Sequence, residues 1–405
     1  MNRLKLYAKQ FHPVVWVLLG GTVLARGASF MTLPFLAIYL SSTMDLHPLL
    51  IGLTIGISPL TGTIGGFIGG YLSDRFGRKP VMLSALMMWC LVFYGFALAD
   101  SPALFVILNA LNGLCSSFFE PTSQALIADL TDKKYRMKAF SLRYTAINVG
   151  ASAGPLLGAY LAAVSADSTF VITGTIYLLY GIFLAVFLAR YKIKKTADPA
   201  KKGATFKESL RVVRRDKALL FLILGSILIN FGYAQIDSTL PQFLENELAN
   251  GIVVYSSLLS INAVMVVILQ LPISSFAEKF QPLQVMMCGS VLLSLGLVCF
   301  SFTNGWIIGI LAMLIVTIGE ILIFPSSSIM IDQLADDTNR GTYFGASQFR
   351  KIGHFAGPIL GGFLLGQTGG QIAFWIIAGL SLGSIVFYRM GNLVTVKAGV
   401  RSVEG

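Results

Sequence analysis

The stretch GASAGPLLGAYL, residues Gly150–Leu161, places a Gly-Pro pair in the middle of an apolar run. Proline removes a backbone donor and clashes with the preceding turn, so an uninterrupted helix tolerates it poorly at such a place. A closely similar stretch, GHFAGPILGGFL, occurs at Gly353–Leu364, half a chain length later. The recurrence predicts that the chain contains an internal repeat.

The expected repeat extends over several further segments. A shift of 203 residues superimposes the two Gly-Pro stretches, and a shift of 204 residues superimposes residues 121–136 on residues 325–340. The identical pairs include Pro121 and Pro325, Ser123 and Ser327, Leu130 and Leu334, Asp132 and Asp336, and Arg136 and Arg340. The same shift places residues 74–76 over 278–280 and residues 81–82 over 285–286. We therefore expect two equivalent halves.

The composition indicates a membrane protein. Of the 405 residues, 55% are hydrophobic and only 12% are charged, whereas soluble domains carry roughly a quarter charged residues. Apolar segments of the ~20 residues that span a bilayer recur along the whole chain. We expect twelve such helices, at about residues 14–40, 50–72, 80–98, 103–128, 139–164, 169–190, 218–244, 254–277, 283–303, 305–330, 343–366 and 371–390. The fold class is therefore all-α, with two pseudo-symmetric six-helix bundles that share one orientation.

The net charge of +11 reports membrane topology rather than a nucleic-acid partner. Connections after the odd-numbered helices, such as SSTMDLHP, ADSP, SADS and TNG, contain no Lys or Arg. Basic residues instead fill the N-terminus, the opposite connections and the C-terminal tail. Because positive residues stay on the cytoplasmic side, we expect a multi-pass protein of the cell membrane with both termini in the cytoplasm.

The expected domain boundaries follow from the same pattern. Residues 1–191 form the first six-helix bundle, residues 192–217 a basic cytoplasmic loop, and residues 218–405 the second bundle with a short cytoplasmic tail. The sequence from Arg190 to Lys217 contains eleven Lys and Arg residues but only three acidic residues, which favours a linker that lies near anionic headgroups. Within it, FKESLRVVRR is suited to a short surface helix.

Two further features constrain the class of protein. The N-terminal apolar run continues to about Leu40, longer than the core of a secretory signal, so we expect an uncleaved first helix. Cys90, Cys115, Cys288 and Cys299 all lie in expected membrane helices. Packing residues are a better interpretation of these cysteines than a disulfide or metal set.

The connection between the second and third expected helices, GGYLSDRFGRKPVM, carries a family resemblance. It resembles the G-x-L-x-D-R-x-G-R-K loop of the major facilitator superfamily at Gly70, Leu72, Asp74, Arg75, Gly77, Arg78 and Lys79. The Gly-Pro stretch, with Gly150, Gly154, Pro155 and Gly158, is similar to the pattern of its twelve-helix drug/proton antiporters, and Gly353, Gly357, Pro358 and Gly361 form the second copy. The resemblance implies secondary transport driven by a proton gradient, without a cofactor.

A physical role for this loop can be argued from its residues. Gly77 permits a tight turn, and the basic residues hold the loop in the cytoplasm. Asp74 is placed to meet the positive N-terminal end of the eleventh helix, a contact that would close the cytoplasmic side. The second half retains only Glu278 and Lys279 of this motif.

The paired Gly-Pro helices allow two interpretations. Their small residues allow another helix to pack closely, and the prolines predict kinks. Both helices are then either simple packing elements or parts of an interface along which the halves rock. Recurrence in register favours the moving interface.

One departure from the family pattern concerns the fourth helix. The antiporters commonly carry an Arg there, within R-x-x-Q-G, whereas this chain has NALNGLC with Asn109 and Asn112. Any proton-coupling role of that Arg must therefore lie elsewhere.

Charged side chains inside the expected helices are functional candidates, because each costs at least ~2.5 to 3.5 kcal/mol at mid-bilayer. Glu320 lies near mid-bilayer, where it can bind a proton and release it when hydration changes. Asp237 lies nearer the outer end of the seventh helix. By resemblance, both match acids that serve protonation and cation binding in some multidrug antiporters. His354 is a weaker candidate, for which a hydrogen-bonded packing role is favoured.

Arg26 is the basic residue placed deep in an expected helix, and it requires a partner or a wet cavity. Asp237, Glu320 and Glu120 compete for that role, and Arg26 is a candidate to replace the missing helix-four Arg. Glu120 precedes a proline towards the cytoplasmic end of the fourth helix. A gate contact and a snorkelling structural residue are equally compatible with that position.

These features favour a transporter over an enzyme. The chain lacks a phosphate-binding G-x-x-x-x-G-K-[ST] loop, metal-spaced clusters and a nucleophile elbow. The leading hypothesis is a proton-coupled antiporter that exports lipophilic or cationic small molecules by alternating access, for which a monomer suffices. One alternative is an exporter or importer of a specific sugar, peptide or lipid-type metabolite. Another is an uncoupled lipid scramblase or a transporter-like sensor.

Overall fold

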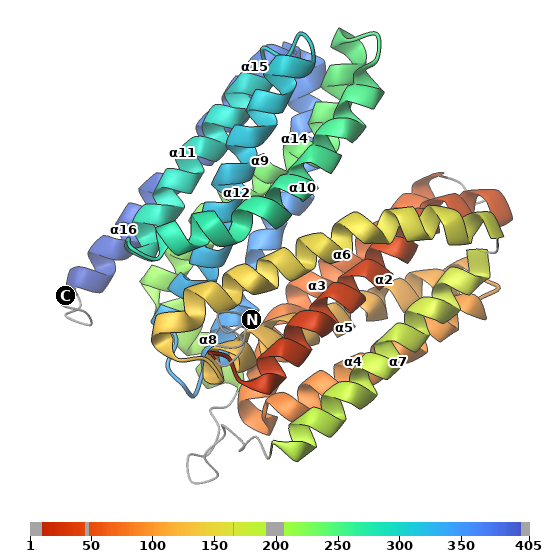
Figure 1. Ribbon diagram of the computed structural model, residues 1–405, viewed down its shortest axis with the longest axis vertical. Coiled ribbons are helices and arrows are strands. Elements are labelled where there is room, and N and C mark those ends of the chain that lie inside the picture. The colour runs from red at the N-terminus through yellow and green to blue at the C-terminus, as the bar shows by residue number, and fades with distance from the viewer. Residues whose placement is uncertain (1–9, 45–47, 165, 192–205, 398–405) are drawn as a thin grey trace, which may run out of the picture. The chain divides into compact units, whose positions relative to one another are not determined.

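The computed structural model of the protein describes residues 10–44, 48–164, 166–191 and 206–397 (Figure 1). Its regular elements in these ranges are all helices. Long apolar runs favour helices in a membrane because an α-helix satisfies every backbone polar group within the segment.

The first half of the chain forms the helices expected from its apolar runs. They are α2 (Pro13–Met44), α3 (Pro48–Phe76), α4 (Arg78–Ala97), α5 (Pro102–Asp129), α6 (Arg136–Val164) and α7 (Ala166–Arg190), with a short 3₁₀ turn, η1 (Lys133–Tyr135), before α6. Pro102 lies in the first turn of α5, where a missing backbone N–H costs nothing.

The second half begins with a short helix, α8 (Phe206–Arg215), within the basic linker. The long helices follow as α9 (Lys217–Glu247), α10 (Gly251–Ala277), α11 (Pro282–Phe300) and α12 (Trp306–Leu334). The chain ends with α13 (Arg340–Ala346), η2 (Ser347–Arg350), α14 (Lys351–Thr368), α15 (Gly370–Leu382) and α16 (Ser384–Lys397). The rest of the expected linker, residues 192–205, lies outside the described residues.

The last two expected helices are present, but each contains a local interruption, and Gly370–Val394 still forms one segment long and apolar enough to cross a membrane. The segment predicted at 343–366 is interrupted by the 3₁₀ turn η2, and the one predicted at 371–390 by a turn at Gly383. Glycine weakens a helix interior, which accounts for the second break. The residues up to Gln348 and those from Phe349 onward belong to different compact units, which are described below.

Nine helical segments of the described chain are long and apolar enough to cross a membrane. The three remaining expected spans are α3, α6 and α14. A total of twelve spans therefore stays a prediction from the sequence.

Helix pairing repeats between the two halves. In the first half, α2 packs against α6, α3 against α5, and α4 against α7. In the second half, α9 packs against α14, α10 against α12, and α11 against α15. These are the same pairs in the order of the twelve expected spans, so the sequence repeat is also a structural repeat.

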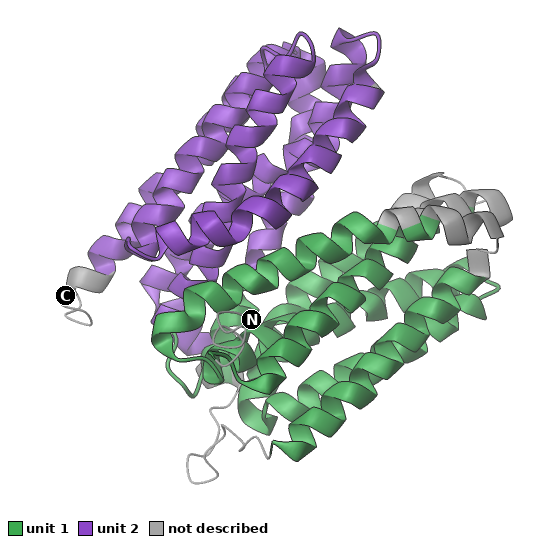
Figure 2. Ribbon diagram, viewed as in Figure 1, with its two compact units in different colours: residues 1–209, 335–348 green, residues 210–334, 349–405 purple. Residues whose placement is uncertain are grey.

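The described chain divides into two compact units (Figure 2). Unit 1 comprises residues 1–209 and 335–348, and unit 2 comprises residues 210–334 and 349–405. The segment Ala335–Gln348 lies in the second half of the sequence but belongs to unit 1. The expected division of the chain at residues 192–217 stays a prediction, and Arg340 of this segment forms an ion pair with Asp129 of the same unit.

The Gly-Pro stretch of α6 packs on α2 within unit 1. A Cβ atom built on Gly150 would lie 2.6 Å from the carbonyl oxygen of Val23, and one on Gly154 would lie 2.6 Å from that of Gly27. Gly158 is buried, and Pro155 falls within α6 with its side chain outside the described residues. The glycines therefore permit a close approach of the two backbones.

The second copy makes the equivalent contacts within unit 2. A Cβ atom on Gly353 would overlap the carbonyl oxygen of Ile227, and one on Gly357 would lie 3.3 Å from that of Phe231. A Cβ on Gly361 would overlap the Gln235 side chain, and the helix continues through Pro358. Both glycine faces are thus used for packing inside their own unit, and a rocking interface stays a prediction.

Candidate functional site

The loop between α3 and α4 makes the tight turn that its glycine predicts. Gly77 has a backbone φ of 95°, a left-handed conformation that favours glycine. Its N–H donates to the carbonyl oxygen of Ser73 at 3.0 Å. The turn directs the end of α3 and the start of α4 so that Asp74 and Arg78 meet.

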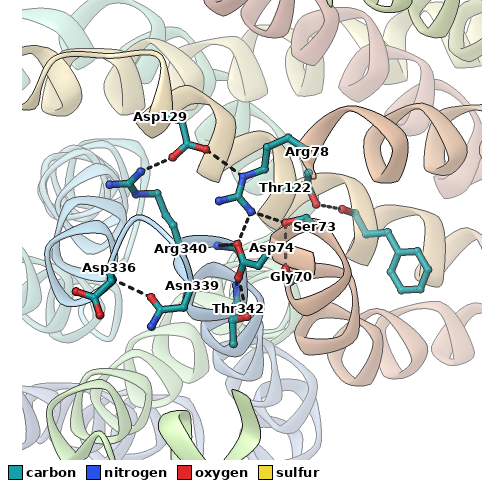
Figure 3. A network of polar contacts seen from close by, with 12 residues as sticks. Gly70, Ser73, Asp74, Arg78, Thr122, Asp129, Asp336, Asn339, Arg340 and Thr342 are labelled. Atoms are coloured by element: carbon teal, nitrogen blue, oxygen red, sulfur yellow. Dashed lines mark hydrogen bonds and ion pairs between the residues drawn. The ribbon is translucent and has the colours of Figure 1, made fainter. Parts of the chain in front are cut away.

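The carboxylate of Asp74 binds the start of α13, as the sequence predicted for the eleventh helix (Figure 3). The Gly341 N–H donates to Asp74 Oδ1 at 2.9 Å. The N–H and the hydroxyl of Thr342 donate to Oδ2 at 2.6 and 2.7 Å. These are donors that a helix start leaves without an intrahelical partner, so an anion is stabilised there.

Two arginines and a second acid complete this cluster. Arg78 donates to Asp74 and, through Nε, to Asp129 Oδ2 at 3.0 Å. Arg340 donates to the other carboxylate oxygen of Asp129 and to Asp337 at 2.7 Å. The side chains of Arg78 and Arg340 are only 4% exposed. Charge-assisted bonds of this kind are stronger than neutral ones, and here they join Arg340 to unit 1.

Four glycines bring α13 close to α3. A Cβ atom on Gly70 would overlap the carbonyl oxygen of Gly341, and one on Gly66 would lie 3.2 Å from that of Gly345. Sequence reasoning singled out Gly70 but missed Gly66, Gly341 and Gly345. Their shared Gly-x-x-x-Gly spacing was the available signal.

The remaining basic residues of the loop lie outside the cluster. Arg75 is exposed, donates to the Tyr71 hydroxyl at 2.7 Å and lies over the Phe76 ring at 5.5 Å. Lys79 is also exposed. Their expected role in holding the loop in the cytoplasm stays a prediction.

Within unit 1, Arg26 on α2 forms an ion pair with Glu120 on α5. Of the three acids considered as its partner, the structure brings Glu120 to it. The Arg26 side chain is 32% exposed and that of Glu120 is 11% exposed. Nearby, Tyr177 donates to the Ala25 carbonyl oxygen at 3.2 Å and shares a hydrogen bond with Ser29 at 2.7 Å.

The fourth-helix asparagines form a neutral polar chain in unit 1. Asn109 donates to the Thr54 carbonyl oxygen at 2.6 Å. Asn112 donates to Asn109 Oδ1 and to Ser58, both at 3.1 Å, and accepts from the Trp89 indole at 2.6 Å. Hydrogen bonds that join α3, α4 and α5 therefore occupy the region where related antiporters carry an arginine.

Glu320 is the most enclosed of the candidate acids. It lies on α12 in unit 2 and is 1% exposed. The Tyr233 hydroxyl on α9 donates to Oε1 at 3.0 Å, and the Asn262 amide on α10 donates to Oε2 at 2.9 Å. Asn262 also donates to Thr317 at 2.9 Å. Sequence reasoning missed Tyr233, Asn262 and Thr317, although a polar Asn262 inside SINAVMVV was a visible signal.

Asp237 and His354 occupy a different position in unit 2. Both side chains are exposed, and they interact electrostatically with each other. Tyr255 on α10 also lies within electrostatic range of Asp237. The packing role of His354 stays a prediction, while the preceding residue, Gly353, packs against α9.

The cysteines form no disulfide. Cys90, Cys115, Cys288 and Cys299 are all free, and the first two are buried. Among the described residues, no group of three or more His, Cys, Asp or Glu side chains is arranged to hold a metal ion.

Comparisons with known proteins agree with this architecture. A family model described as Major Facilitator Superfamily matches residues 18–351 and 254–402. The chain is 37% identical to the uncharacterized MFS-type transporter YqjV of Bacillus subtilis (strain 168), over 96% of this chain and 97% of that protein. It is 28% identical to a Na(+), Li(+), K(+)/H(+) antiporter of Planococcus maritimus, over 87% of this chain and 89% of that protein.

A more distant relative and a solved structure show the same similarity. The chain is 26% identical to the multidrug resistance protein MdtH of Escherichia coli (strain SE11), over 89% of each. The crystal structure of the human organic anion transporter MFSD10 shares the fold, with a TM-score of 0.76 at 20% identity over 93% of this chain and 98% of that chain. The chain belongs to the major facilitator superfamily of multi-pass membrane transporters.

Proposed function

We propose that this transporter is a proton-coupled antiporter that exports lipophilic, cationic small molecules by alternating access. The observation that carries the proposal is the environment of Glu320. This carboxyl group is 1% exposed inside a membrane bundle and accepts hydrogen bonds from neutral groups on two other helices.

Such a carboxyl group is suited to reversible protonation. A charge in an apolar interior is expensive, and a proton removes that charge without requiring additional space. The donors from Tyr233 and Asn262 stabilise the ionised form. A change in the hydration or packing of α9 and α10 therefore shifts the balance between the two forms, which is the requirement for coupling.

Asp237 has the complementary properties of a contact for a larger cation. Its side chain is exposed, and Tyr255 lies within electrostatic range. An exposed carboxylate near an aromatic ring can attract an organic ammonium group without the helices separating. We propose that Glu320 carries the proton and Asp237 meets the substrate charge.

Two relatives support the proposed class of transport. The Planococcus maritimus protein is named an ion/H(+) antiporter, and MdtH is named a multidrug resistance protein. The similarity covers most of each chain. We extend the proposal to a cell-membrane location with cytoplasmic termini, where the Asp74 cluster holds Arg340–Thr342 in one state of the cycle and releases them in the other.

The proposal is tested in proteoliposomes that carry an imposed pH gradient. A lipophilic cationic dye is followed with the wild type, Glu320→Gln and Glu245→Gln, the last being an exposed acid at the end of α9. We expect gradient-driven dye movement in the wild type and the control, and its loss in Glu320→Gln.

Each other outcome contradicts a defined part of the proposal. Equal dye movement in the wild type and Glu320→Gln would remove Glu320 from coupling. Movement that ignores the gradient would indicate uncoupled transport, as in a scramblase. A wild type that moves no cationic dye would direct attention to sugar, peptide or lipid-type substrates.

A further inference from the structure

Five side-chain oxygen or amide groups converge around Glu320. They are its two carboxylate oxygens, the Thr317 hydroxyl one turn earlier on α12, the Asn262 side chain on α10 and the Tyr233 hydroxyl on α9. Carboxylate, hydroxyl and amide oxygens are the ligands that hard metal cations prefer. The set comes from three helices, so it encloses a position rather than lining one surface.

The Asn262 amide now fills the position that a cation would take. Its Nδ2 atom lies 2.9 Å from both Thr317 Oγ1 and Glu320 Oε2. The positive end of an amide dipole therefore sits between two oxygens. A half-turn of the amide places its own oxygen on the same side, because the two ends of the group have nearly the same shape.

The burial of the cluster restricts the size and charge of its ligand. Glu320 is 1% exposed and Thr317 is 0% exposed. Because α10 packs against α12 around these buried groups, an organic cation would require the two helices to separate, so the burial favours a single dehydrated ion. One positive charge neutralises the carboxylate, but a divalent ion would leave a net charge in an apolar interior, which is costly.

We propose that Glu320, Thr317, Asn262 and Tyr233 form a site for a dehydrated monovalent alkali cation, and that this ion and the proton compete for the Glu320 carboxylate. The inference rests on the proposed function in that both use the same carboxyl group. It adds a second, inorganic ligand class to that group. Exchange of the two ions at one acid would make transport depend on sodium as well as on pH.

The ionisable groups around the site are few. The helices packed against α12 are α11, α10 and α9. Their ionisable side chains are Cys288 and Cys299 on α11, Tyr255 on α10, and Lys217, Tyr233, Asp237, Glu245 and Glu247 on α9, with Asp332 on α12 itself. Of these, Tyr233 donates a hydrogen bond to Glu320. Asp237 is the other acid well inside a helix, so it must be tested separately.

The experiment measures binding of radioactive sodium to the purified full-length protein in detergent, with choline as the replacement ion. We expect saturable binding at pH about 8 that weakens progressively as the pH is lowered, because protons then compete with sodium for the same carboxyl group. Glu320→Gln should abolish this binding. Asp237→Asn should retain it.

A matched pair of threonine variants tests the ligand set. Thr317→Val removes a proposed ligand and should weaken sodium binding by about tenfold. Thr239→Val removes an equally buried hydroxyl on α9, which bonds to Gln235 at 2.5 Å, and should bind sodium as the wild type does. Thermal unfolding of each variant shows that a loss of binding is not a loss of folding.

The contrary results are distinct from failure of the proposed function. Sodium binding that is absent, or equal in the wild type and a folded Glu320→Gln, overturns the cation site even if proton-driven dye export is intact. Binding that is unchanged by Thr317→Val overturns the ligand set. Conversely, saturable sodium binding without any dye export would sustain this inference and contradict the multidrug proposal.

Discussion

Asp74 accepts the backbone N–H of Thr342 at 2.6 Å, although the two residues are 268 positions apart in the sequence. The bond joins the last turn of α3 to the first turn of α13, and ion pairs of Arg78, Asp129 and Arg340 lie beside it (Figure 3). The segment Ala335–Gln348, which contains Thr342, belongs to unit 1 and packs against α3 and α5.

The first prediction concerns the charge of Asp74. Asp74→Asn keeps one acceptor oxygen but loses the second and the ion pair with Arg78, so we expect a loss of about 1.5–3 kcal/mol in unfolding free energy. Thermal unfolding in detergent measures the change. The matched control is Asp100→Asn, an exposed acid in the connection before α5. Equal effects of the two substitutions would contradict the role of the Asp74 contacts.

The second prediction concerns the shape of Arg340. Its guanidinium binds Asp129 and Asp337 at the same time, which a lysine ammonium cannot reproduce with the same geometry. Arg340→Lys should therefore lower both thermal stability and gradient-driven transport. The control is Arg190→Lys at an exposed position at the end of α7, and it should change neither thermal stability nor transport. A silent Arg340→Lys would show that charge alone suffices at this position.

The third prediction compares two glycines of α14. A Cβ on Gly353 would overlap the Ile227 carbonyl oxygen, whereas a Cβ on Gly362 would meet no atom within 4 Å. Gly353→Ala should cost roughly 1–3 kcal/mol through overpacking. Gly362→Ala should be neutral or stabilising because alanine favours a helix. Thermal unfolding of the two variants measures these effects. A Gly353→Ala variant as stable as the wild type would contradict the close contact of Gly353 with α9.

The fourth prediction concerns the ion pair of Arg26 and Glu120. Glu120→Gln leaves the guanidinium without this counterion, and we expect a cost of about 2 kcal/mol, reduced because Arg26 is about a third exposed. The double variant Arg26→Gln with Glu120→Gln should be more stable than Glu120→Gln alone. A double-mutant cycle of unfolding free energies measures the coupling. Additive effects would contradict a direct interaction.

Much of the fold was predictable from local properties of the sequence. The apolar run expected at 254–277 becomes α10, Gly251–Ala277, because the hydrophobic length of a membrane helix is set by the bilayer. The turn at Gly77 follows from the conformational freedom of one residue. The internal repeat is visible as matched residues in the sequence and as matched helix pairs in the structure.

The arrangement of the buried polar groups was less predictable. The sequence identified Arg26, Glu120 and Glu320 by the cost of burying charge, but the choice of partner depends on how each helix is rotated about its axis. For the same reason, the sequence did not identify Tyr233 and Asn262 as hydrogen-bond donors to Glu320. The bond of Arg340 to Asp129 joins residues 211 positions apart, so no local pattern in the sequence could indicate it.

The most direct test of proton coupling follows the protons themselves. Proteoliposomes with a pH-sensitive dye inside and no initial pH gradient receive a lipophilic cation on one side. The account predicts that wild-type protein moves protons against the cation flux and that Glu320→Gln moves none, with Glu245→Gln behaving as the wild type. Substrate-driven proton movement of equal size in Glu320→Gln would contradict the central claim.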